Sequence, residues 1–258
     1  MDDTKPVLAR EIEYHERLYA GFAQQHFARP AVRALRAHMV ARILTVTDTA
    51  KTARALSLGC GIGDTELMLA PYVSELVGID LAPSAIRQAR MDAASAGAGN
   101  LQFVEGSLET AGLSSESFDL IFAIFFLHHL PQTLLESLPG SVFSLLRPGG
   151  QFYSLDPSRY RLSGAIGSIV VPHLMRKYQS PDERQLDRAS TAALFSRAGF
   201  AVQSGFYDFV SSPLAGLAPG WRPGYAIARR LDDLLVRTPL LSRLGSNFEI
   251  IARKPPRP

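Results

Sequence analysis

The stretch of sequence that decides the fold reads Leu56-Ser57-Leu58-Gly59-Cys60-Gly61-Ile62-Gly63-Asp64. It continues a short apolar run, residues 54–58, that predicts a strand, and it opens a predicted helix near Asp64. Glycines allow positive φ and let a ligand approach the main chain where a Cβ would otherwise lie. The first amides of a helix have no partner within it and favour an anion or a carboxylate. In this strand–turn–helix context, the glycine-rich turn predicts a cofactor-binding site.

A carboxylate follows the turn at a spacing that suits a nucleoside site. Asp80 lies 21 residues after Gly59, at the end of a second predicted strand, residues 74–79. A carboxylate in that place can accept both hydrogen bonds of a ribose diol. The alternative is that Asp80 caps the helix that begins near Pro83. The turn and the acid together favour a cofactor that contains adenosine.

Strands and helices alternate on both sides of these motifs. The apolar patterns predict strands at residues 54–58, 74–79, 101–104, 118–125, 151–155, 200–209 and 247–252. They predict helices at 7–28, 30–43, 83–96 and 190–198, one after Asp64, two short ones near Pro131 and Pro139, and an amphipathic one that carries Ile227, Leu231, Leu234 and Leu235. Such alternation implies right-handed crossovers and a parallel sheet. We therefore expect an N-terminal helical cap, residues 1–48, and a core, residues 49–258, with an insertion at about 157–187.

The composition is that of an ordinary globular protein. Hydrophobic residues make up 47% of the 258 residues and charged residues 20%, and the net charge is only +3, which does not favour a nucleic-acid partner. From Trp221 onward, eight Lys and Arg residues stand against three acids. This local excess is either a solvated helix face with a basic tail or a surface for an acidic substrate or an anionic membrane. Peripheral membrane contact is therefore left open.

Other features of the chain favour a cytoplasmic protein. Cys60 is the only cysteine, which excludes an intrachain disulfide and suits a reducing compartment. Residues 1–5 are acidic where a signal peptide would be basic. No run of about eighteen apolar residues occurs, so a transmembrane helix is not expected. Nothing in the pattern indicates the oligomeric state.

Five short motifs occur in a fixed order along the chain. They are Leu58-Gly59-Cys60-Gly61-Ile62-Gly63, Gly78-Ile79-Asp80-Leu81, Phe118-Asp119-Leu120-Ile121, Leu127-His128-His129-Leu130 and Leu146-Arg147-Pro148-Gly149-Gly150. Together they resemble class I S-adenosylmethionine (SAM)-dependent methyltransferases of the small-molecule type. The resemblance covers residues 50–156 and, more weakly, 188–210 and 245–254. It implies an α/β, Rossmann-like fold with a seven-stranded, mostly parallel sheet and a reversed strand at its edge.

The resemblance also implies which residues bind the cofactor. SAM would be the methyl donor and S-adenosylhomocysteine (SAH) the product, with no metal. The cofactor-binding residues would be Gly59, Cys60, Gly61, Gly63, Asp80, Leu81, Ser107, Leu108 and Phe125. The main chain of the turn would hold the methionine end, Asp80 the ribose and Leu81 the adenine. Ser57 and Ser107 depart from the family, because each stands where an acid is common and a serine supplies no charge.

Methyl transfer from a sulfonium depends mainly on geometry. Placing the nucleophile in line accounts for roughly 7–11 kcal/mol of the barrier, whereas a general base contributes about 10²–10⁴-fold. His128 and His129 follow the fourth strand, on the rim where open α/β sheets bind ligands, and are candidate bases together with Tyr14. The candidate substrate-binding residues are Tyr19, Asp156, Tyr207 and Trp221. For all of these residues the alternative is packing, capping or a turn.

Three functions remain open from the sequence. The first is methyl transfer to an O, N or C atom of a small metabolite held under the N-terminal helix and the 157–187 segment. The second applies the same reaction to a lipid or lipid-linked glycan, with the apolar patch at 166–175 and the basic helix at 225–237 on a membrane surface. The third is a cofactor-binding partner or sensor without turnover, suggested by the two serines. A cysteine-nucleophile enzyme is excluded because Cys60 lies in the turn, and the histidines lack metal-ligand spacing.

Overall fold

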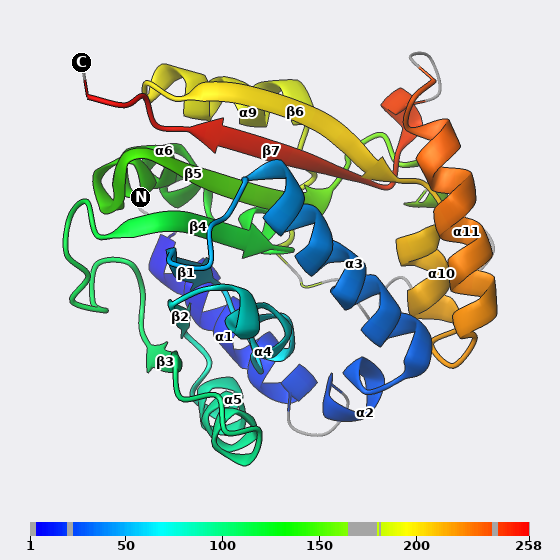
Figure 1. Ribbon diagram of the computed structural model, residues 1–258. Coiled ribbons are helices and arrows are strands. Elements are labelled where there is room, and N and C mark those ends of the chain that lie inside the picture. The colour runs from blue at the N-terminus through cyan, green and yellow to red at the C-terminus, as the bar shows by residue number, and fades with distance from the viewer. Residues whose placement is uncertain (1–3, 20–22, 165–179, 181, 239–241, 258) are drawn as a thin grey trace.

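Among the described residues, seven strands form one sheet in the order β3-β2-β1-β4-β5-β7-β6 (Figure 1). This computed structural model describes residues 4–19, 23–164, 180, 182–238 and 242–257. The strands are β1 (Arg54–Leu58), β2 (Glu75–Asp80), β3 (Leu101–Glu105), β4 (Phe118–Ile124), β5 (Leu146–Pro157), β6 (Ala201–Asp208) and β7 (Asn247–Arg253). Strands β3 to β5 are parallel, whereas β7 runs antiparallel to both β5 and β6. The predicted mixed sheet with a reversed strand near its edge is confirmed.

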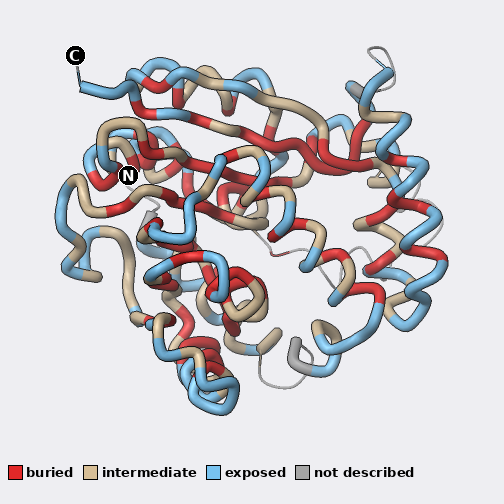
Figure 2. Tube along the Cα trace, viewed as in Figure 1, coloured by how far each residue is buried: buried red, intermediate tan, exposed pale blue. Residues whose placement is uncertain are grey.

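Helices cover both faces of the sheet (Figure 1). They are α1 (Thr4–Tyr19), α2 (Ala23–Phe27), α3 (Pro30–Val46), α4 (Asp64–Leu69), α5 (Pro83–Ser95), α6 (Gln132–Leu145), α9 (Arg188–Arg197), α10 (Ser211–Leu217) and α11 (Arg222–Leu235), with short 3-10 turns η1 (Ala70–Tyr72), η2 (Leu127–His129) and η3 (Ser242–Leu244). One core joins the sheet to α3, α4, α5, α10 and α11, and the other joins it to α6 and α9. Strand residues alternate between the two cores, so that Ala55 faces the first and Leu56 the second. Figure 2 shows β7 and the central strands mostly buried.

The direction of the parallel strands determines at which edge of the sheet a ligand can bind. Because β1, β2 and β4 run in the same direction, their carboxyl ends meet at one edge of the sheet. Ligands of open α/β sheets bind outside these ends, where the strand order reverses. The chain leaves β1 toward β2 on one side and later returns to β4 on the other. The glycine-rich turn after β1 therefore lies at this switch point. None of the described helices has the length and apolar character that crossing a bilayer requires.

Two predicted helical regions differ from the structure. Where one helix was expected over residues 7–28, the structure has α1 and α2, and residues 20–22 between them lie outside the described part. The expected pair of short helices near Pro131 and Pro139 is wrong, because α6 is continuous with Pro139 inside it. A proline inside a helix removes one backbone hydrogen bond and disfavours the helix locally, so other contacts must keep α6 continuous. The buried leucines and valine of α6 pack against the sheet on both sides of Pro139 and hold the helix together.

The region after β6 also differs from its prediction. Helix α10 lies in a stretch for which the sequence analysis predicted neither a helix nor a strand. In α11, the expected apolar face does not point to the core: Ile227, Leu231 and Leu234 are exposed, and Leu235 is only half-buried. The buried face carries Gly224, Tyr225, Ala228, Arg229 and Asp232 instead. The sequence predicted an amphipathic helix here but not the direction in which its apolar face points.

Hydrogen bonds of two charged residues explain this orientation. The Asp232 carboxylate accepts the backbone N–H groups of residues 209–211 at 2.8–3.1 Å, where α10 begins. Arg229 donates to the carbonyl of Tyr207 at 3.1 Å and pairs with Asp233 at 2.9 Å. A buried charge without such partners would cost far more than an exposed leucine. The polar side of α11 therefore faces the protein.

Strand β5 is longer than predicted and leads into the expected insertion. It runs from Leu146 to Pro157, whereas the sequence predicted 151–155. Beyond it, the structure describes residues 158–164, 180 and 182–187. The apolar patch at 166–175 lies outside the described residues. At the other end, α3 packs in the same core as β1 and β4.

Candidate active site

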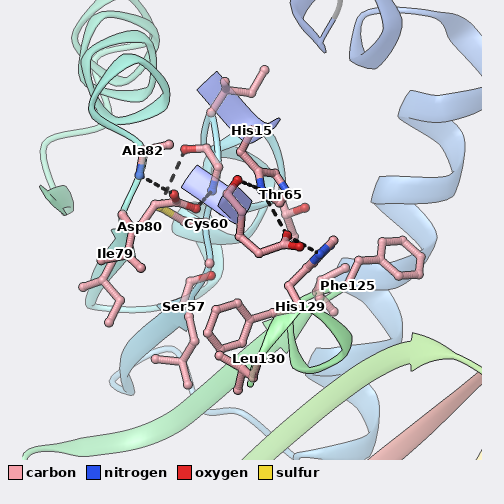
Figure 3. Close-up of a pocket in the computed structure, with 18 of the residues that line it drawn as sticks. His15, Ser57, Cys60, Thr65, Ile79, Asp80, Ala82, Phe125, His129 and Leu130 are labelled. Atoms are coloured by element: carbon pink, nitrogen blue, oxygen red, sulfur yellow. Dashed lines mark hydrogen bonds and ion pairs between the residues drawn. The ribbon is translucent and has the colours of Figure 1, made fainter. Parts of the chain in front are cut away.

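A cavity of about 760 Å³ lies at the carboxyl ends of β1, β2 and β4. The glycine-rich turn and Asp80 form one part of its wall, and α1 and η2 form another (Figure 3). Helices α3, α6 and α10 close the remaining sides. Most of the lining side chains are apolar, among them Leu8, Ile12, Leu108, Phe125 and Leu134. A pocket of this size and character binds an organic ligand.

The glycines of the turn meet two different requirements. Gly61 has φ of 53°, and a Cβ on it would lie 2.5 Å from the hydroxyl of Tyr19, which lines the cavity. Gly63 has φ of 76° and begins α4, and a Cβ there would lie 2.4 Å from the ring of Phe103 in the core. Gly61 thus keeps the cavity wall open, while Gly63 lets α4 pack. Consistent with this difference, Gly63 does not line the cavity among the described residues.

Asp80 joins the glycine turn to the next helix. Its Oδ2 accepts the N–H of Gly61 at 2.8 Å, and its Oδ1 accepts the N–H of Ala82 at 2.9 Å (Figure 3). Ala82 is the residue before α5, so the capping alternative from the sequence describes part of what Asp80 does. Each carboxylate oxygen can accept a second hydrogen bond. Since Asp80 also lines the cavity, it can hold the turn and bind a ligand hydroxyl at the same time.

A second carboxyl group stands beside the turn. Glu66 of α4 is buried and accepts a hydrogen bond from the Ser57 hydroxyl at 2.5 Å. Its other oxygen, Oε2, is buried without a hydrogen-bond partner, and both Ser57 and Glu66 line the cavity. Burial raises the pKa of Glu66 to about 7, although the Ser57 hydroxyl opposes the shift. The charge that Ser57 does not supply is therefore available from Glu66.

The cavity wall formed by the residues after β2 and β3 suits an adenine ring. Leu81, Ser107 and Leu108 line the cavity. The Ser107 hydroxyl donates to Glu109 at 3.0 Å, so an acid stands next to the serine where the family carries one. Phe125 also lines the cavity and has φ of 55°, which is strained for a residue with a side chain. Strain of this kind concentrates at functional sites.

His129 and Glu11 meet on the cavity wall. Nδ1 of His129 lies 3.0 Å from Oε2 of Glu11, which comes from α1 (Figure 3). Burial lowers the pKa of His129, so its ring is neutral near pH 7. Burial alone would raise the pKa of Glu11, but the neighbouring His129 and Ser180 side chains outweigh burial and lower that pKa. With Nδ1 facing a carboxylate, Nε2 of His129 carries the free lone pair. The pair has the form of a base with its orienting acid.

His15 stands next to this pair. Its ring lies 4.8 Å from that of His129, and its Nδ1 is 2.8 Å from the carbonyl oxygen of Glu11. Glu11, His15 and His129 together place ligand-type atoms within 4.8 Å of one another, a grouping that the sequence spacing did not indicate. Nδ1 of His129 also lies 3.3 Å from the Ser180 hydroxyl, whereas both carboxylate oxygens of Glu11 are buried without a hydrogen-bond partner among the described residues. Glu11 and His129 therefore form a close pair of ionisable groups, 3.0 Å apart, whose carboxylate still has unfilled hydrogen-bonding capacity.

His128 points away from the cavity into the protein. Its Nδ1 lies 2.9 Å from Oδ1 of Asp156, and the same oxygen accepts the backbone N–H of His128 at 3.3 Å. Burial lowers the pKa of His128 and raises that of Asp156, so both groups resist ionisation. Neither residue is among the described residues that line the cavity. This buried pair fixes the turn η2 and thereby the position of His129.

The remaining candidates divide between the cavity and other parts of the fold. Tyr19 lines the cavity, and Tyr14 does not. Tyr207 is buried in the core against Arg229, and Trp221 is largely exposed at the start of α11. Of the sequence-predicted cofactor residues, all but Gly63 line the cavity. The sequence analysis did not include Glu11 and Glu66 among the candidate site residues. Their places in the site follow from contacts that form only in the fold, Glu11 with His129 and Glu66 with Ser57.

Comparisons with known proteins agree on one family. A family model described as a methyltransferase domain matches residues 55–150. The uncharacterized methyltransferase YcgJ of Bacillus subtilis is 28% identical over 150 residues, which are 58% of this chain and 58% of that protein. A ubiquinone biosynthesis O-methyltransferase of Xanthomonas axonopodis pv. citri is 26% identical over 155 residues, which are 58% of this chain and 64% of that protein. The alignments thus span less than two thirds of these relatives.

A solved structure extends the similarity beyond the matched region. The crystal structure of YcgJ superposes with a TM-score of 0.58 at 22% sequence identity, covering 85% of this chain and 99% of that one. At this identity the superposition establishes the shared fold. The motifs, the family match and the strand order all point the same way. Residues 55–150 therefore match a methyltransferase domain, and the chain has the fold of methyltransferases such as YcgJ.

Proposed function

We propose that the protein transfers a methyl group from SAM to an O, N or C atom of an apolar small molecule held in the cavity. The observation that carries this proposal is that one cavity contains the glycine turn, Asp80 and the Glu11–His129 pair. Ligand pockets measure about 300–1,000 Å³. At about 760 Å³, this cavity is large enough for a small acceptor beside the cofactor.

The residues around the turn fit the cofactor. Gly61 leaves the main chain accessible, Asp80 offers oxygens to the ribose, and Leu81 and Leu108 provide apolar walls for the adenine. At the amino-acid end, Arg36 lines the cavity as a cation and Glu66 as an acid. SAM, when bound, supplies an electrophilic methyl group on its sulfonium. The protein needs to hold an acceptor in line with that group and to remove its proton.

His129 is the group that we assign to proton removal. Its neutral ring presents Nε2 as a base, while the Glu11 carboxylate, 3.0 Å from Nδ1, stabilises the imidazolium that forms when Nε2 takes the acceptor's proton. Leu8 and Ile12 of α1 line the same cavity and would hold the acceptor from the cap. Positioning accounts for roughly 7–11 kcal/mol of barrier reduction, which is more than the base contributes. The cap is therefore as important to the reaction as the histidine.

Transfer of a label tests this proposal. Purified protein is incubated with tritium-labelled SAM and fractions of a bacterial extract, separated into water-soluble and solvent-extractable metabolites. We expect protein-dependent label in the solvent-extractable fraction. If the protein binds SAH but labels no fraction, it is a cofactor-binding partner or sensor, and the proposed transfer is wrong.

Glu66 gives a prediction about the amino-acid end of the cofactor. We expect Glu66→Gln to lower the affinity for SAH about 10- to 100-fold, because a hydrogen-bonded charge pair with the α-ammonium is lost. Affinity for 5′-methylthioadenosine, which lacks the amino acid, should not change. In the double variant Ser57→Asp with Glu66→Gln, a carboxylate returns at the neighbouring position and SAH affinity should recover. Calorimetric titration measures the affinities of the wild type, the single variant and the double variant for both ligands. Equal losses for both ligands would contradict the assignment.

The same carboxyl group predicts a pH dependence. Glu66 has its pKa raised to about 7, and only its ionised form pairs with an ammonium group. Below that pH, binding must expel a proton, so SAH affinity should fall as the pH drops through 7. In Glu66→Gln this dependence should disappear. Titrations of both proteins across pH 5.5–8, within about one and a half units of that pKa, make the comparison.

A lipid acceptor is the second candidate. The apolar lining of the cavity and the exposed apolar face of α11 favour it. The similarity to a protein named for ubiquinone biosynthesis adds support. Vesicles that carry a lipid-soluble quinol would then be labelled in the assay above. Label confined to the water-soluble fraction would count against this candidate.

We further propose a cytoplasmic location and no nucleic-acid partner. The lone cysteine, Cys60, is buried in the turn, which suits a reducing compartment. The net charge of +3 gives little general attraction to nucleic acid.

A further inference from the structure

Helix α11 exposes a continuous apolar stripe. Ile227, Leu231 and Leu234 are 65%, 46% and 66% exposed, and their spacing of four and three residues puts them on one side of the helix. Figure 1 shows α11 at the outside of the molecule beside α10, and Figure 2 shows its exposed and buried residues alternating. Leu217 at the end of α10 and Trp221 before α11 are exposed as well. Exposed apolar residues that gather in this way mark an interaction surface.

Arginines border this stripe. Arg230 follows Ile227 by three residues and so lies beside the apolar side chains, and Arg237 comes two residues after the end of α11. Both are exposed, as is Arg222 in the first turn. The exposed acid of the helix, Asp233, is paired with Arg229. The face that α11 presents is therefore apolar with a positive margin.

We propose that this face of α11 docks on an anionic membrane surface. Helices that lie in the headgroup region insert an apolar side while basic residues pair with anionic lipids. Ile227, Leu231 and Leu234 would enter the boundary between headgroups and acyl chains. Arg230 and Arg237 would lie at the level of the phosphates. The arrangement on α11 meets both requirements.

A second copy of the chain is a poorer occupant. In a two-fold interface the same surface meets itself, which would bring the arginines of two α11 helices together. An anionic lipid neutralises them instead. The charge at the margin of the stripe therefore favours a membrane over self-association.

Docking through α11 also brings the cavity close to the lipid. Ser212, Ala215 and Gly216 of α10 line the cavity, and α10 packs against α11. An apolar acceptor could pass from the bilayer to the cavity along α10. This last step rests on the proposed function, whereas docking itself does not.

Vesicle flotation tests the docking. The full chain is floated with vesicles of phosphatidylcholine alone and of phosphatidylcholine mixed with phosphatidylglycerol. We expect binding only to the anionic vesicles, and weaker binding as salt is added. Arg230→Gln with Arg237→Gln should reduce the partition coefficient about fivefold for each arginine removed. Ile227→Ser with Leu234→Ser should reduce it further, because the apolar insertion is lost.

The control variants distinguish docking through α11 from general surface hydrophobicity, misfolding and dimer formation. Tyr72→Ser with Met91→Ser removes two apolar side chains elsewhere, which are 53% and 56% exposed, and should leave vesicle binding unchanged. Every variant should keep wild-type affinity for SAH, which shows that it is folded and that the outcome is independent of catalysis. The proposal is overturned if the wild type does not float, or if the control variant loses as much as the α11 variants. It is also overturned if light scattering shows a dimer that Ile227→Ser with Leu234→Ser converts to a monomer.

Discussion

Replacing His129 by glutamine is expected to slow methyl transfer by about 10²–10⁴-fold, the range that a general base contributes. Glutamine keeps the approximate size of the ring and an N–H donor near Glu11, but it cannot accept a proton. Affinity for SAH should remain at the wild-type value, because His129 stands on the wall opposite the glycine turn. The measurement compares the turnover with label from SAM and the affinity from calorimetry.

Two further variants sharpen this comparison. Glu11→Gln should give a smaller loss than His129→Gln, because the base remains while the charge that stabilises its protonated form is gone. His38→Gln is the matched control, since His38 packs on Tyr207 away from the cavity. If His129→Gln turns over like the wild type, the acceptor needs no base and the assignment of the pair is wrong.

The pH profile of turnover tests which protonation state of His129 is the active one. Burial holds the pKa of His129 below its ordinary value of 6.5. The base is therefore already unprotonated at neutral pH, and the turnover number should fall only as the pH drops below 6.5. A rise in turnover that continues through pH 8 would instead indicate that another group loses the proton.

Replacing Asp80 by alanine is expected to lower the affinity for SAH roughly 10- to 100-fold. A hydrogen bond to a charged group is worth about 1.5–3 kcal/mol, and the ribose would lose such bonds. The variant also frees the N–H groups of Gly61 and Ala82, which Asp80 holds at 2.8 and 2.9 Å, so the turn itself loosens. Asp92→Ala, which removes a carboxylate from the far end of α5, is the control.

An isosteric variant distinguishes binding from folding at this position. Asp80→Asn retains one acceptor oxygen and should fall between wild type and alanine in SAH affinity. Thermal unfolding monitors the loss of the two backbone bonds separately. If both variants unfold earlier but bind SAH like the wild type, Asp80 only holds the turn and the ribose is bound elsewhere.

Local signals made the cofactor half of the site readable from the sequence. The turn at Gly59–Gly63 lies between an apolar strand and a helix, and Asp80 ends the next strand, so two short patterns were sufficient. The sheet followed for the same reason, because strands buried on both faces are apolar runs. These features depend on neighbours within a few residues.

The part of the site that contains Glu11 and His129 could not be predicted from the sequence, because it depends on contacts between residues far apart along the chain. Glu11 and His129 are 118 residues apart and meet only because α1 packs over the carboxyl ends of the strands. Glu66 gained a role from the hydroxyl of Ser57, nine residues earlier. For α11, periodicity identified the apolar stripe but not the direction it faces, which Asp232 decides by bonding to the start of α10.

The measurement that tests the central claim most directly is a calorimetric titration of the full chain with SAH. The geometry of the turn, Asp80 and Glu66 predicts saturable binding at one site per chain, weakened by Asp80→Ala and by Glu66→Gln and unchanged by Asp92→Ala. Absence of binding heat at millimolar SAH, or binding that none of these substitutions alters, would contradict the claim that this cavity holds the methyl donor.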